Sequence, residues 1–236
     1  MFTPHSIQTS LSVREKFFSL GHKIINIPTL KITSANMKSI DPDDYDAFIF
    51  TSANAIRNLN VKNSKKNIIC FCVGAITEKI VRQSGYLNTI SAGGTINALK
   101  NLILNSDYIK ESSKIAYFCG DNLSSELDLD LKKEGMKIEK IVNYLSDKIT
   151  DLNDANKKII KNHPPDVIFV YSSRSAQSFI KIIKDYYLYP LMTGSKVMCI
   201  SKKVATIFKS NGWKKIVIFN PGEEIIKLEK LTKWMY

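Results

Sequence analysis

Hydroxyl and amide side chains mark a strand-to-helix turn in the segment DAFIFTSANAIRNL, residues 46–59. The apolar run 47–50 is typical of a strand buried on both faces of a parallel sheet, and the apolar residues after the turn recur at helical spacing. Thr51-Ser52-Ala53-Asn54 therefore lies at a helix start, where unpaired backbone N–H groups and the helix dipole can receive an anion. Serine and asparagine are also ordinary N-caps, so one such turn predicts either a helix cap or an anion site.

The same kind of turn occurs a second time. The segment DVIFVYSSRSAQSFI begins at Asp166 and sets Ser172 against Ser52. Two further internal matches follow in the same order along the chain. The three matched pairs are 46–60 with 166–180, 70–85 with 198–212 and, more faintly, 11–32 with 125–149. Three ordered matches predict two similar α/β halves.

Strands alternate with short helices along most of the sequence, which predicts doubly wound parallel sheets. The predicted strands are 1–3, 23–27, 47–50, 67–73, 114–119, 136–141, 166–171, 196–200 and 215–219. The predicted helices are 12–20, 54–60, 75–84, 96–105, 123–134, one between 152 and 166, 174–184, 202–210 and 222–234. Residues 91–95, SAGGT, are predicted to form a flexible loop.

A lone N-terminal strand-helix-strand cannot form a sheet of normal size, so we expect it to join the C-terminal third of the chain. The first domain is then discontinuous, residues 1–30 plus 150–236, and the second is 37–141. Two extended segments, 28–36 and 142–150, are expected to run side by side as a two-stranded connector. The predicted fold class is α/β, with two similar doubly wound, flavodoxin-like domains. A ligand is expected in a cleft between the lobes, at the carboxyl ends of strands.

The composition is that of an ordinary globular protein, 236 residues of which 44% are hydrophobic. No apolar run approaches the roughly 20 residues of a membrane helix, and the first dozen residues lack the regions of a signal peptide, so we expect a cytoplasmic protein. The four cysteines lie in or beside predicted strands: Cys70, Cys72, Cys119 and Cys199. They lack the spaced partners of a zinc site, so we expect buried free thiols and neither a metal nor a disulfide.

The charge balance is strongly basic. The chain has 34 Lys+Arg and 22 Asp+Glu, a net charge of +12, which draws it toward an anionic partner. The basic residues are nearly all lysine and are dispersed in pairs, a usage that a genome of low GC content also produces. No nucleic-acid-binding motif accompanies them, and Gly93-Gly94 lacks the GK[ST] of a Walker loop. The charge alone leaves open a nucleic acid, a membrane surface or a small polyanion.

Five features occur in a fixed order along the chain. They are FTSANA at 50–55, VG-x-x-T at 73–77, Tyr144 in the second extended segment, YSSRSA at 171–176, and helices ended by glycine. In this order and spacing they resemble the uroporphyrinogen-III synthase family over nearly the whole chain. The resemblance implies a two-lobed α/β lyase that uses no cofactor or metal. Such an enzyme acts on hydroxymethylbilane, a linear tetrapyrrole, removes its terminal hydroxyl as water and closes the ring with inversion of ring D, for haem or related tetrapyrroles.

The resemblance makes Tyr144 the catalytic group, as acid or hydrogen-bond donor to the departing hydroxyl, and a half-buried strand tyrosine is the alternative. The substrate carries eight carboxylates, which helix N-termini, hydroxyls and lysines suit. The expected substrate-binding residues are Ser52, Ala53, Asn54, Gly74, Ala75, Ile76, Thr77, Gly120, Ser172, Ser173, Ser201, Lys202 and Lys203. For the serines at 52 and 172 and for Thr77, helix capping alone is the alternative.

The chain departs from the family pattern at three turns. Thr3-Pro4 follows closely after the first residue, where family members usually have a full strand and an arginine-proline turn. Ser201-Lys202-Lys203-Val204 replaces a Gly-Pro-Thr-Thr-like turn, so one expected hydroxyl is missing and a lysine charge could replace it. Cys119-Gly120-Asp121 replaces an Arg-Gly turn.

Two other functions stay open. A non-catalytic two-lobed protein that binds a small anionic ligand shares the anion turns but has no use for Tyr144. A basic nucleic-acid-binding protein needs a clustered lysine face and a steep salt dependence of binding. We expect a small polycarboxylate as the partner, bound by a monomer that binds neither nucleic acid nor a membrane.

Overall fold

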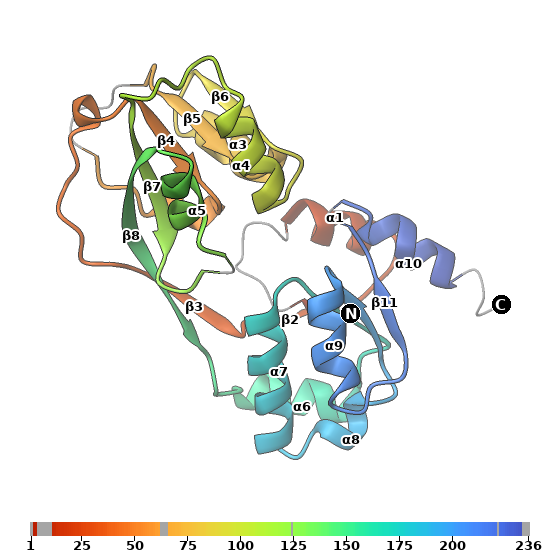
Figure 1. Ribbon diagram of the computed structural model, residues 1–236. Coiled ribbons are helices and arrows are strands. Elements are labelled where there is room, and N and C mark those ends of the chain that lie inside the picture. The colour runs from red at the N-terminus through yellow and green to blue at the C-terminus, as the bar shows by residue number, and fades with distance from the viewer. Residues whose placement is uncertain (1, 4–10, 62–65, 124, 221, 233–236) are drawn as a thin grey trace. The chain divides into compact units, whose positions relative to one another are not determined.

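The computed structural model describes residues 2–3, 11–61, 66–123, 125–220 and 222–232. Four predicted elements or motifs include residues outside these ranges, namely Met1, Pro4, Ser124 and residues 233–234. The chain divides into two compact units. The first unit is Met1–Lys31 with Asp147–Tyr236, and the second unit is Ile32–Ser146. Figure 1 labels most of the helices and strands of both units.

The first unit is built on a five-stranded parallel sheet in the order β2-β1-β9-β10-β11. Its strands are β1 (Phe2–Thr3), β2 (Ile25–Asn26), β9 (Val167–Val170), β10 (Lys196–Cys199) and β11 (Ile216–Ile218). Its helices are α1 (Leu11–Ser19), α6 (Asp154–Asn162), α7 (Ser173–Asp185), α8 (Tyr189–Met192), α9 (Lys202–Lys209) and α10 (Glu224–Thr232). One core cluster packs the sheet against α6 to α9, and another packs it against α1 and α10. The unit is therefore doubly wound.

The second unit has a six-stranded sheet in the order β3-β8-β7-β4-β5-β6. Its strands are β3 (Leu30–Ser34), β4 (Ala47–Phe50), β5 (Ile69–Cys72), β6 (Thr89–Ser91), β7 (Lys114–Gly120) and β8 (Lys137–Lys148). Its helices are the 3-10 turn η1 (Pro42–Asp44), α2 (Ala53–Arg57), α3 (Ala75–Gln83), α4 (Ile96–Leu104) and α5 (Leu127–Lys133). Helices α2 and α3 contribute to the core on one face, and α4 and α5 to the core on the other.

Strand β4 shows why a continuous apolar run forms the centre of this sheet. Phe48 and Phe50 point into the core beside α2 and α3, and Ala47 and Ile49 point into the core beside α4 and α5. All four side chains are fully buried. A strand covered by helices on both faces has no solvent side, so it needs no alternating polar residues.

The two units share one spatial layout with a different chain order. Strands β2-β1-β9-β10-β11 of the first unit correspond in position to β8-β7-β4-β5-β6 of the second. The three internal sequence matches pair equivalent elements: β4 and α2 with β9 and α7, β5 and α3 with β10 and α9, and α5 and β8 with α1 and β2. The second unit is thus a circular permutation of the first, and the prediction of two similar doubly wound halves is confirmed.

The chain passes between the units along β3 and again along β8, which are neighbours in one sheet. The backbone N–H of Ala35 donates to the carbonyl of Asn143, and that of Ile149 donates to Thr29. From the first unit to the second, the residue number rises from 29 to 35 on one strand and falls from 149 to 143 on the other. The two strands therefore run antiparallel.

Four predicted elements differ from the structure. The predicted strand 136–141 and most of the extended segment 142–150 form one continuous strand, β8, which outruns β7 and pairs with β3. The predicted loop 91–95 begins inside β6, a three-residue edge strand too short to give a pattern. Helix α2 ends at Arg57 and α5 starts at Leu127, so both are shorter than predicted. Helix α8 was not predicted.

Candidate active site

The Ser52 turn joins β4 to α2 at the carboxyl edge of the second unit's sheet. Ser52 is the N-cap of α2, with extended backbone angles, and its Oγ accepts a hydrogen bond of 3.1 Å from the Asn54 N–H. Ser52, Ala53 and Asn54 are all half-buried. Ser52 therefore caps α2, as the alternative interpretation of this turn predicts. An oxygen that accepts from the backbone still has its own proton to donate, so capping and a second contact are compatible.

Tyr144 lies on β8 beside this turn. Its phenol is within hydrogen-bonding reach of the Ser52 side chain and of the Gly120 backbone. Burial raises the pKa of Tyr144, and the nearby Ser52 hydroxyl and Gly120 backbone offset part of that rise. The phenol therefore keeps its proton at neutral pH. It is half-buried at the end of a parallel sheet, where such folds place ligands.

Gly120, the last residue of β7, lies directly against the tyrosine ring. A Cβ added to Gly120 would lie 2.6 Å from Cε2 and Cζ of Tyr144 and 2.9 Å from its Oη. The strand register is irregular between Cys119 and Gly120, which brings Gly120 opposite Tyr144. Asp121 then fixes β8, because its N–H donates to the Tyr144 carbonyl at 3.1 Å and its Oδ1 accepts from Ser146 N–H at 3.0 Å. Only glycine fits at 120 with the ring in this position.

Asn143 ties the short helix α2 to the strand that carries the tyrosine. Its side chain is fully buried, and its Nδ2 donates to the Ala55 carbonyl at 2.6 Å. Helix α2 has only five residues, so it makes few hydrogen bonds of its own. Asn143 therefore helps to hold the Ser52 turn at a fixed distance from Tyr144, the next residue along β8.

We expect Asn143→Leu to lower the free energy of unfolding by about 1–3 kcal/mol, because the Ala55 carbonyl is left buried without its donor. Urea unfolding of the variant measures the loss. Asn97→Leu on the exposed surface of α4 is the matched control, with an expected change within about 0.5 kcal/mol. Equal losses in both variants would contradict a special role for the Asn143 bond.

A second turn of the site lies at the end of β5, next to β4. Gly74 is the N-cap of α3 and offers no side chain for capping. A Cβ on Gly74 would lie 3.2 Å from the Cα of Gly94, whose φ of +89° is a glycine conformation. The Gly94 N–H donates to the Val73 carbonyl at 2.8 Å. The turn and the Gly93-Gly94 loop therefore pack backbone against backbone.

The predicted residues of this turn differ in exposure. Ala75 and Ile76 are exposed, and Ile76 retains 52% of its accessible surface. Thr77 is buried, at 6%. The structure thus turns the first two residues of α3 toward solvent and Thr77 toward the protein.

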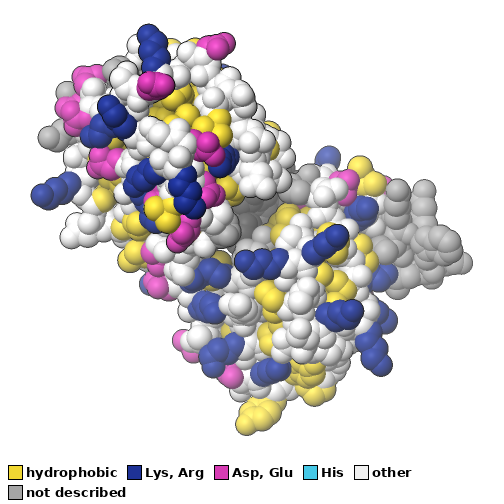
Figure 2. Space-filling view, in the orientation of Figure 1, with side chains coloured by type: hydrophobic (Ala, Val, Ile, Leu, Met, Phe, Trp, Pro, Cys, Tyr) yellow, Lys and Arg dark blue, Asp and Glu magenta, His cyan; other side chains and the backbone are white. Residues whose placement is uncertain are grey.

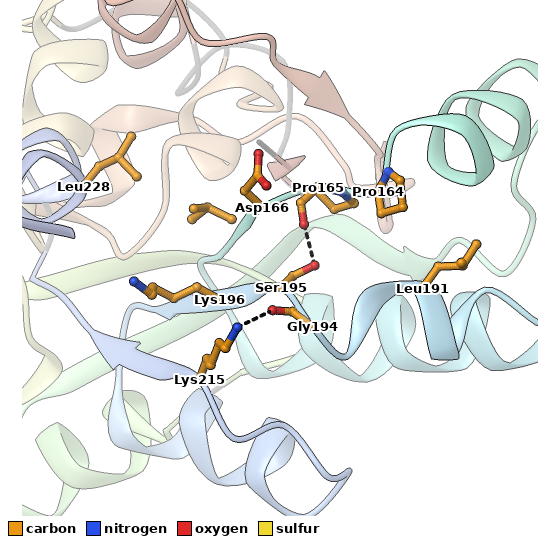
Figure 3. A pocket seen from close by; sticks show the side chains of 10 residues that line it. Pro164, Pro165, Asp166, Leu191, Gly194, Ser195, Lys196, Lys215 and Leu228 are labelled. Carbon is orange, nitrogen blue, oxygen red and sulfur yellow. Dashed lines mark hydrogen bonds between the residues drawn. The ribbon is translucent and has the colours of Figure 1, made fainter. Parts of the chain in front are cut away.

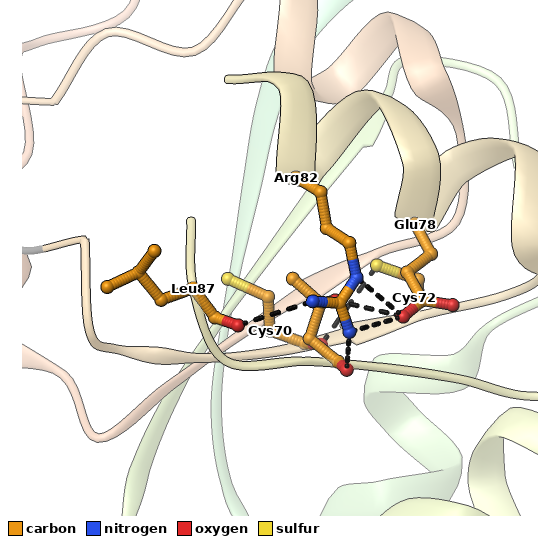
Figure 4. A network of polar contacts seen from close by, with 6 residues as sticks. Cys70, Cys72, Glu78, Arg82 and Leu87 are labelled. Carbon is orange, nitrogen blue, oxygen red and sulfur yellow. Dashed lines mark hydrogen bonds and ion pairs between the residues drawn. The ribbon is translucent and has the colours of Figure 1, made fainter. Parts of the chain in front are cut away.

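A polar network below the turn fastens α3 to β6 (Figure 4). The Glu78 Oε1 accepts from Arg82 Nη2 at 2.9 Å, from Arg82 Nε at 3.1 Å and from Thr89 Oγ1 at 2.9 Å. Hydrogen bonds, first from Ser91 and then from Arg82, lower the pKa of Glu78. Because Ser91 and Thr89 belong to β6, the network fixes the strand that leads into the Gly93-Gly94 loop.

Glu78 is expected to make stability depend on pH. Its pKa is lower in the folded state, so its contribution is fully present above the unfolded pKa of about 4.3 and is lost as the pH falls through the folded value. We expect Glu78→Gln to cost about 1 kcal/mol at pH 7, discounted for the exposure of Arg82, and little at pH 3. Urea unfolding at both pH values tests this, with the exposed Glu111→Gln as control. A loss that is the same at both pH values would refute the linkage.

The first unit presents two equivalent turns at the carboxyl edge of its own sheet. Ser172 caps α7: its Oγ accepts from the Ser175 N–H at 3.0 Å and lies 2.9 Å from the Ser175 Oγ. Ser201 caps α9 by accepting from the Val204 N–H at 3.3 Å. The Ile200 N–H donates to the Val170 carbonyl, which brings the two strand ends side by side. Ser173 is half-buried, and the exposed pair Lys202-Lys203 opens α9.

Comparison with known proteins identifies the family. A family model described as Uroporphyrinogen-III synthase HemD matches residues 12–221. The chain belongs to the uroporphyrinogen-III synthase family. Members of this family are lyases of tetrapyrrole synthesis, as the resemblance predicted. No protein of curated function matches the sequence.

Solved structures of the family share the fold. The uroporphyrinogen-III synthetase of Helicobacter pylori has 17% sequence identity and a TM-score of 0.68, with 98% of each chain covered. A mutant uroporphyrinogen III synthase of the extremely thermophilic bacterium Thermus thermophilus has 12% identity and a TM-score of 0.57, with 99% of this chain and 98% of the other covered. At these identities the likeness establishes the two-unit α/β fold of the family.

Within each unit, the predicted site residues of this uroporphyrinogen-III synthase family member gather at neighbouring strand ends. In the second unit they are Ser52, Ala53, Asn54, Gly120 and Tyr144, with Gly74, Ala75, Ile76 and Thr77 at the next strand end. In the first unit they are Ser172, Ser173, Ser201, Lys202 and Lys203. Val204, the counterpart of Thr77, is buried as well.

One hydroxyl pair at the site was not predicted. Thr51 Oγ1 lies 3.2 Å from the Oη of Tyr117, a fully buried residue of β7. Burial raises the pKa of Tyr117. The pair connects β4 to β7 immediately before the Ser52 turn. Tyr117 stands in an apolar run that gives no local sign of a polar contact, whereas Thr51 is the first residue of the predicted turn.

A cavity of about 440 Å³ lies at the opposite edge of the first unit's sheet (Figure 3). Asp166, Lys196 and Lys215 stand at or before the amino ends of β9, β10 and β11 and line it together with apolar side chains such as Leu191. Lys215 donates to the Gly194 carbonyl at 3.2 Å. None of the predicted site residues lines this cavity, so it is separate from the candidate active site.

The cysteines and the other potential metal ligands limit the chemistry that the chain can perform. All four cysteines are buried and free, as predicted, and burial raises the pKa of Cys119 to about 11 and that of Cys199 to about 12. Such thiols are unreactive at neutral pH. Among the described residues no group of His, Cys, Asp and Glu could hold a metal ion. In the same ranges, no helix has the length and apolar character needed to cross a bilayer.

Proposed function

We propose that this chain closes hydroxymethylbilane to uroporphyrinogen III, with Tyr144 as hydrogen-bond donor to the departing hydroxyl. The observation that carries the proposal is the protonated phenol at the carboxyl edge of the second unit's sheet, between the Ser52 hydroxyl and the Gly120 backbone. When the C–O bond breaks, the oxygen leaves as water with one proton. The freed carbon bonds to the ring D carbon that already carries the bridge to ring C, and that older C–C bond then breaks. The bridge carbon bonds instead to the other α-carbon of ring D, which loses a proton, so ring D is inverted and the proton taken by the leaving oxygen is returned.

The raised pKa of Tyr144 supports the role of donor over that of base. A phenol whose pKa lies above the usual value near 10 stays protonated throughout the physiological range. It is a weak acid, so its contribution is a hydrogen bond that strengthens as charge develops on the leaving oxygen. The second unit therefore supplies the donor without a titration that would limit activity near neutral pH.

The strand-end turns supply partners for carboxylates. In the second unit these are the α2 turn at Ser52–Asn54, the α3 turn at Gly74–Thr77 and the Gly120 backbone. In the first unit they are Ser172, Ser173, Ser201, Lys202 and Lys203. Backbone N–H groups at helix starts and lysine charges both favour carboxylates. Binding the substrate at several carboxylates raises the effective concentration of its two ends and favours closure.

Family membership favours this enzyme over a non-catalytic binding protein for a small anion. The contacts of Asn143, Gly120 and Asp121 all fix the position of Tyr144, which such a binding protein has no need to fix. We further propose a cytoplasmic monomer that binds neither nucleic acid nor a membrane, since a small water-soluble polycarboxylate is sufficient as its partner.

The deciding experiment is the isomer composition of the product. Freshly generated hydroxymethylbilane is incubated with the protein, oxidised and separated into type I and type III uroporphyrin. Spontaneous closure gives only type I, so an excess of type III is expected. Type I alone from correctly folded protein would overturn the proposed function.

A further inference from the structure

The positive charge of the chain lies almost entirely in the first unit. That unit has 20 Lys and Arg against 9 Asp and Glu, a net charge of +11, whereas the second unit has 14 against 13, a net charge of +1. A genome that favours lysine codons raises lysine in both units alike. It does not explain why only the second unit balances its lysines with acids. The difference therefore points to an anionic partner of the first unit.

The excess is greatest in one continuous segment, Ser195–Asn220, which we call the basic segment. It comprises β10, α9 and β11 and contains no aspartate or glutamate. Its lysines are Lys196, Lys202, Lys203, Lys209, Lys214 and Lys215. All but Lys196 are exposed, and none of the six forms an ion pair with another described residue. On the face shown in Figure 2, Lys and Arg outnumber Asp and Glu over α7 and α9.

The equivalent segment of the second unit shows what the basic segment lacks. Helix α3 pairs Arg82 with Glu78, as Figure 4 shows, whereas α9 has Lys209 and Ala205 at the corresponding positions. Helix α3 opens with Ala75-Ile76, whereas α9 opens with Lys202-Lys203. Lysines in a first turn oppose the helix dipole and reduce stability. Lys202 and Lys203 therefore do not stabilise α9, whereas Lys209, like Arg82 of α3, lies in a last turn that favours a cation.

We propose that the basic segment of the first unit attracts the anionic substrate and sets the rate of its capture, while the second unit supplies the phenol. The inference rests on the proposed function, which makes the ligand a small polycarboxylate. A protein surface that carries charge of one sign raises the association rate of an oppositely charged ligand by about 10- to 1000-fold, and salt suppresses this effect. Lys202 and Lys203 open α9 directly after the Ser201 turn. The other four lysines of the segment lie toward the opposite edge of the sheet, so they act on the substrate through their long-range field and not by contact.

The aromatic residues of the basic segment favour this ligand over single-stranded nucleic acid. Phe208, Trp213 and Phe219 are all buried, with at most 2% of their surface exposed. Single-stranded DNA or RNA binds by stacking its bases on exposed aromatic side chains as well as by charge. The basic segment offers charge without such stacking surfaces.

Stopped-flow binding of uroporphyrin I, a non-reacting octacarboxylate, to the full-length protein tests the proposal. The variant K209Q/K214Q removes two exposed charges of the basic segment that lie outside the candidate site. The control K132Q/K133Q removes two exposed charges of the second unit. In low salt the association rate constant should fall about threefold in K209Q/K214Q and hardly at all in the control, and about 0.5 M salt should remove the difference. Dissociation rates and kcat should not change.

Three alternative outcomes of the binding experiment would each overturn the proposal. Equal slowing in both variants means that total charge matters and the first unit has no special part. An association rate without salt dependence excludes electrostatic capture. Binding of a single-stranded RNA oligonucleotide that is tighter than that of uroporphyrin I, and weakened by K209Q/K214Q, assigns the segment to nucleic acid. The isomer assay is separate: type I product alone sinks the synthase function, whereas type III product with equal rates sinks only the capture role.

Discussion

Replacing Tyr144 by phenylalanine is expected to lower kcat for type III formation by on the order of 100-fold, with a much smaller change in KM. The ring and its packing against Gly120 stay, and only the hydroxyl beside Ser52 is lost. A donor to the leaving oxygen acts as charge develops, so its loss affects the transition state more than the bound substrate. Part of the activity remains, because the turns still hold the two ends of the chain together.

The control for Tyr144→Phe is Tyr108→Phe, which removes a phenol hydroxyl from an exposed tyrosine of the same unit. Tyr108→Phe should leave kcat and KM unchanged. Single-turnover measurements with freshly generated hydroxymethylbilane, with both isomers quantified, separate the catalysed from the spontaneous reaction. Wild-type kcat in Tyr144→Phe would remove the phenol from the chemistry and leave catalysis to positioning alone.

The fold was predictable from the sequence because the chain repeats itself. The matches of 46–60 with 166–180 and of 70–85 with 198–212 each cover a buried strand, a turn and a helix, which are the most regular parts of such a sheet. Continuous apolar runs such as β4 and β9 give a strong signal, since both of their faces are buried. The circular permutation of the two units was not predicted, because it appears only in the order of strands in space.

The strands whose extent was mispredicted depend on a distant partner. Strand β6 has three residues and exists through its pairing with β5. Strand β8 continues to Lys148 because β3 pairs with it beyond the end of β7, and the lysines, asparagine and serine along it interrupt any apolar pattern. Local sequence carries little information on either, because the stabilising hydrogen bonds come from residues far away in the chain.

In the candidate site, too, local features were predictable from the sequence and long-range contacts were not. The Ser52, Ser172 and Ser201 turns were predictable, since a cap residue, a preceding strand and a following helix are all local features. Gly120 was predicted, but the long-range contacts that join the strands and helix around Tyr144 were not. Asn143 reaches Ala55 and Thr51 reaches Tyr117 across 88 and 66 positions of sequence, and no local pattern encodes either contact.

Gly120→Ala is expected to be as damaging to activity as the loss of the phenol. The new methyl group would lie 2.6 Å from two ring carbons of Tyr144, far inside van der Waals contact, so the ring must move or the strands must separate. Overpacking of this kind costs about 1–3 kcal/mol of folding free energy. A displacement of about 1 Å in a positioned donor costs about 100-fold in rate, and that is the expected fall in kcat.

Two further variants show whether Gly120 acts through the ring. Gly194→Ala is the control, because a Cβ there meets no atom within 4 Å and its φ is not positive, so stability and kcat should stay near wild type. In Gly120→Ala/Tyr144→Ala the clash is gone, and urea unfolding should show less loss than the sum of the two single variants. Additive losses would mean that Gly120 is needed for the irregular register between β7 and β8 and not for the position of the phenol. The fall in kcat would then reflect a displaced strand edge, and Asp121, which binds the Tyr144 backbone, would become the residue that positions the donor.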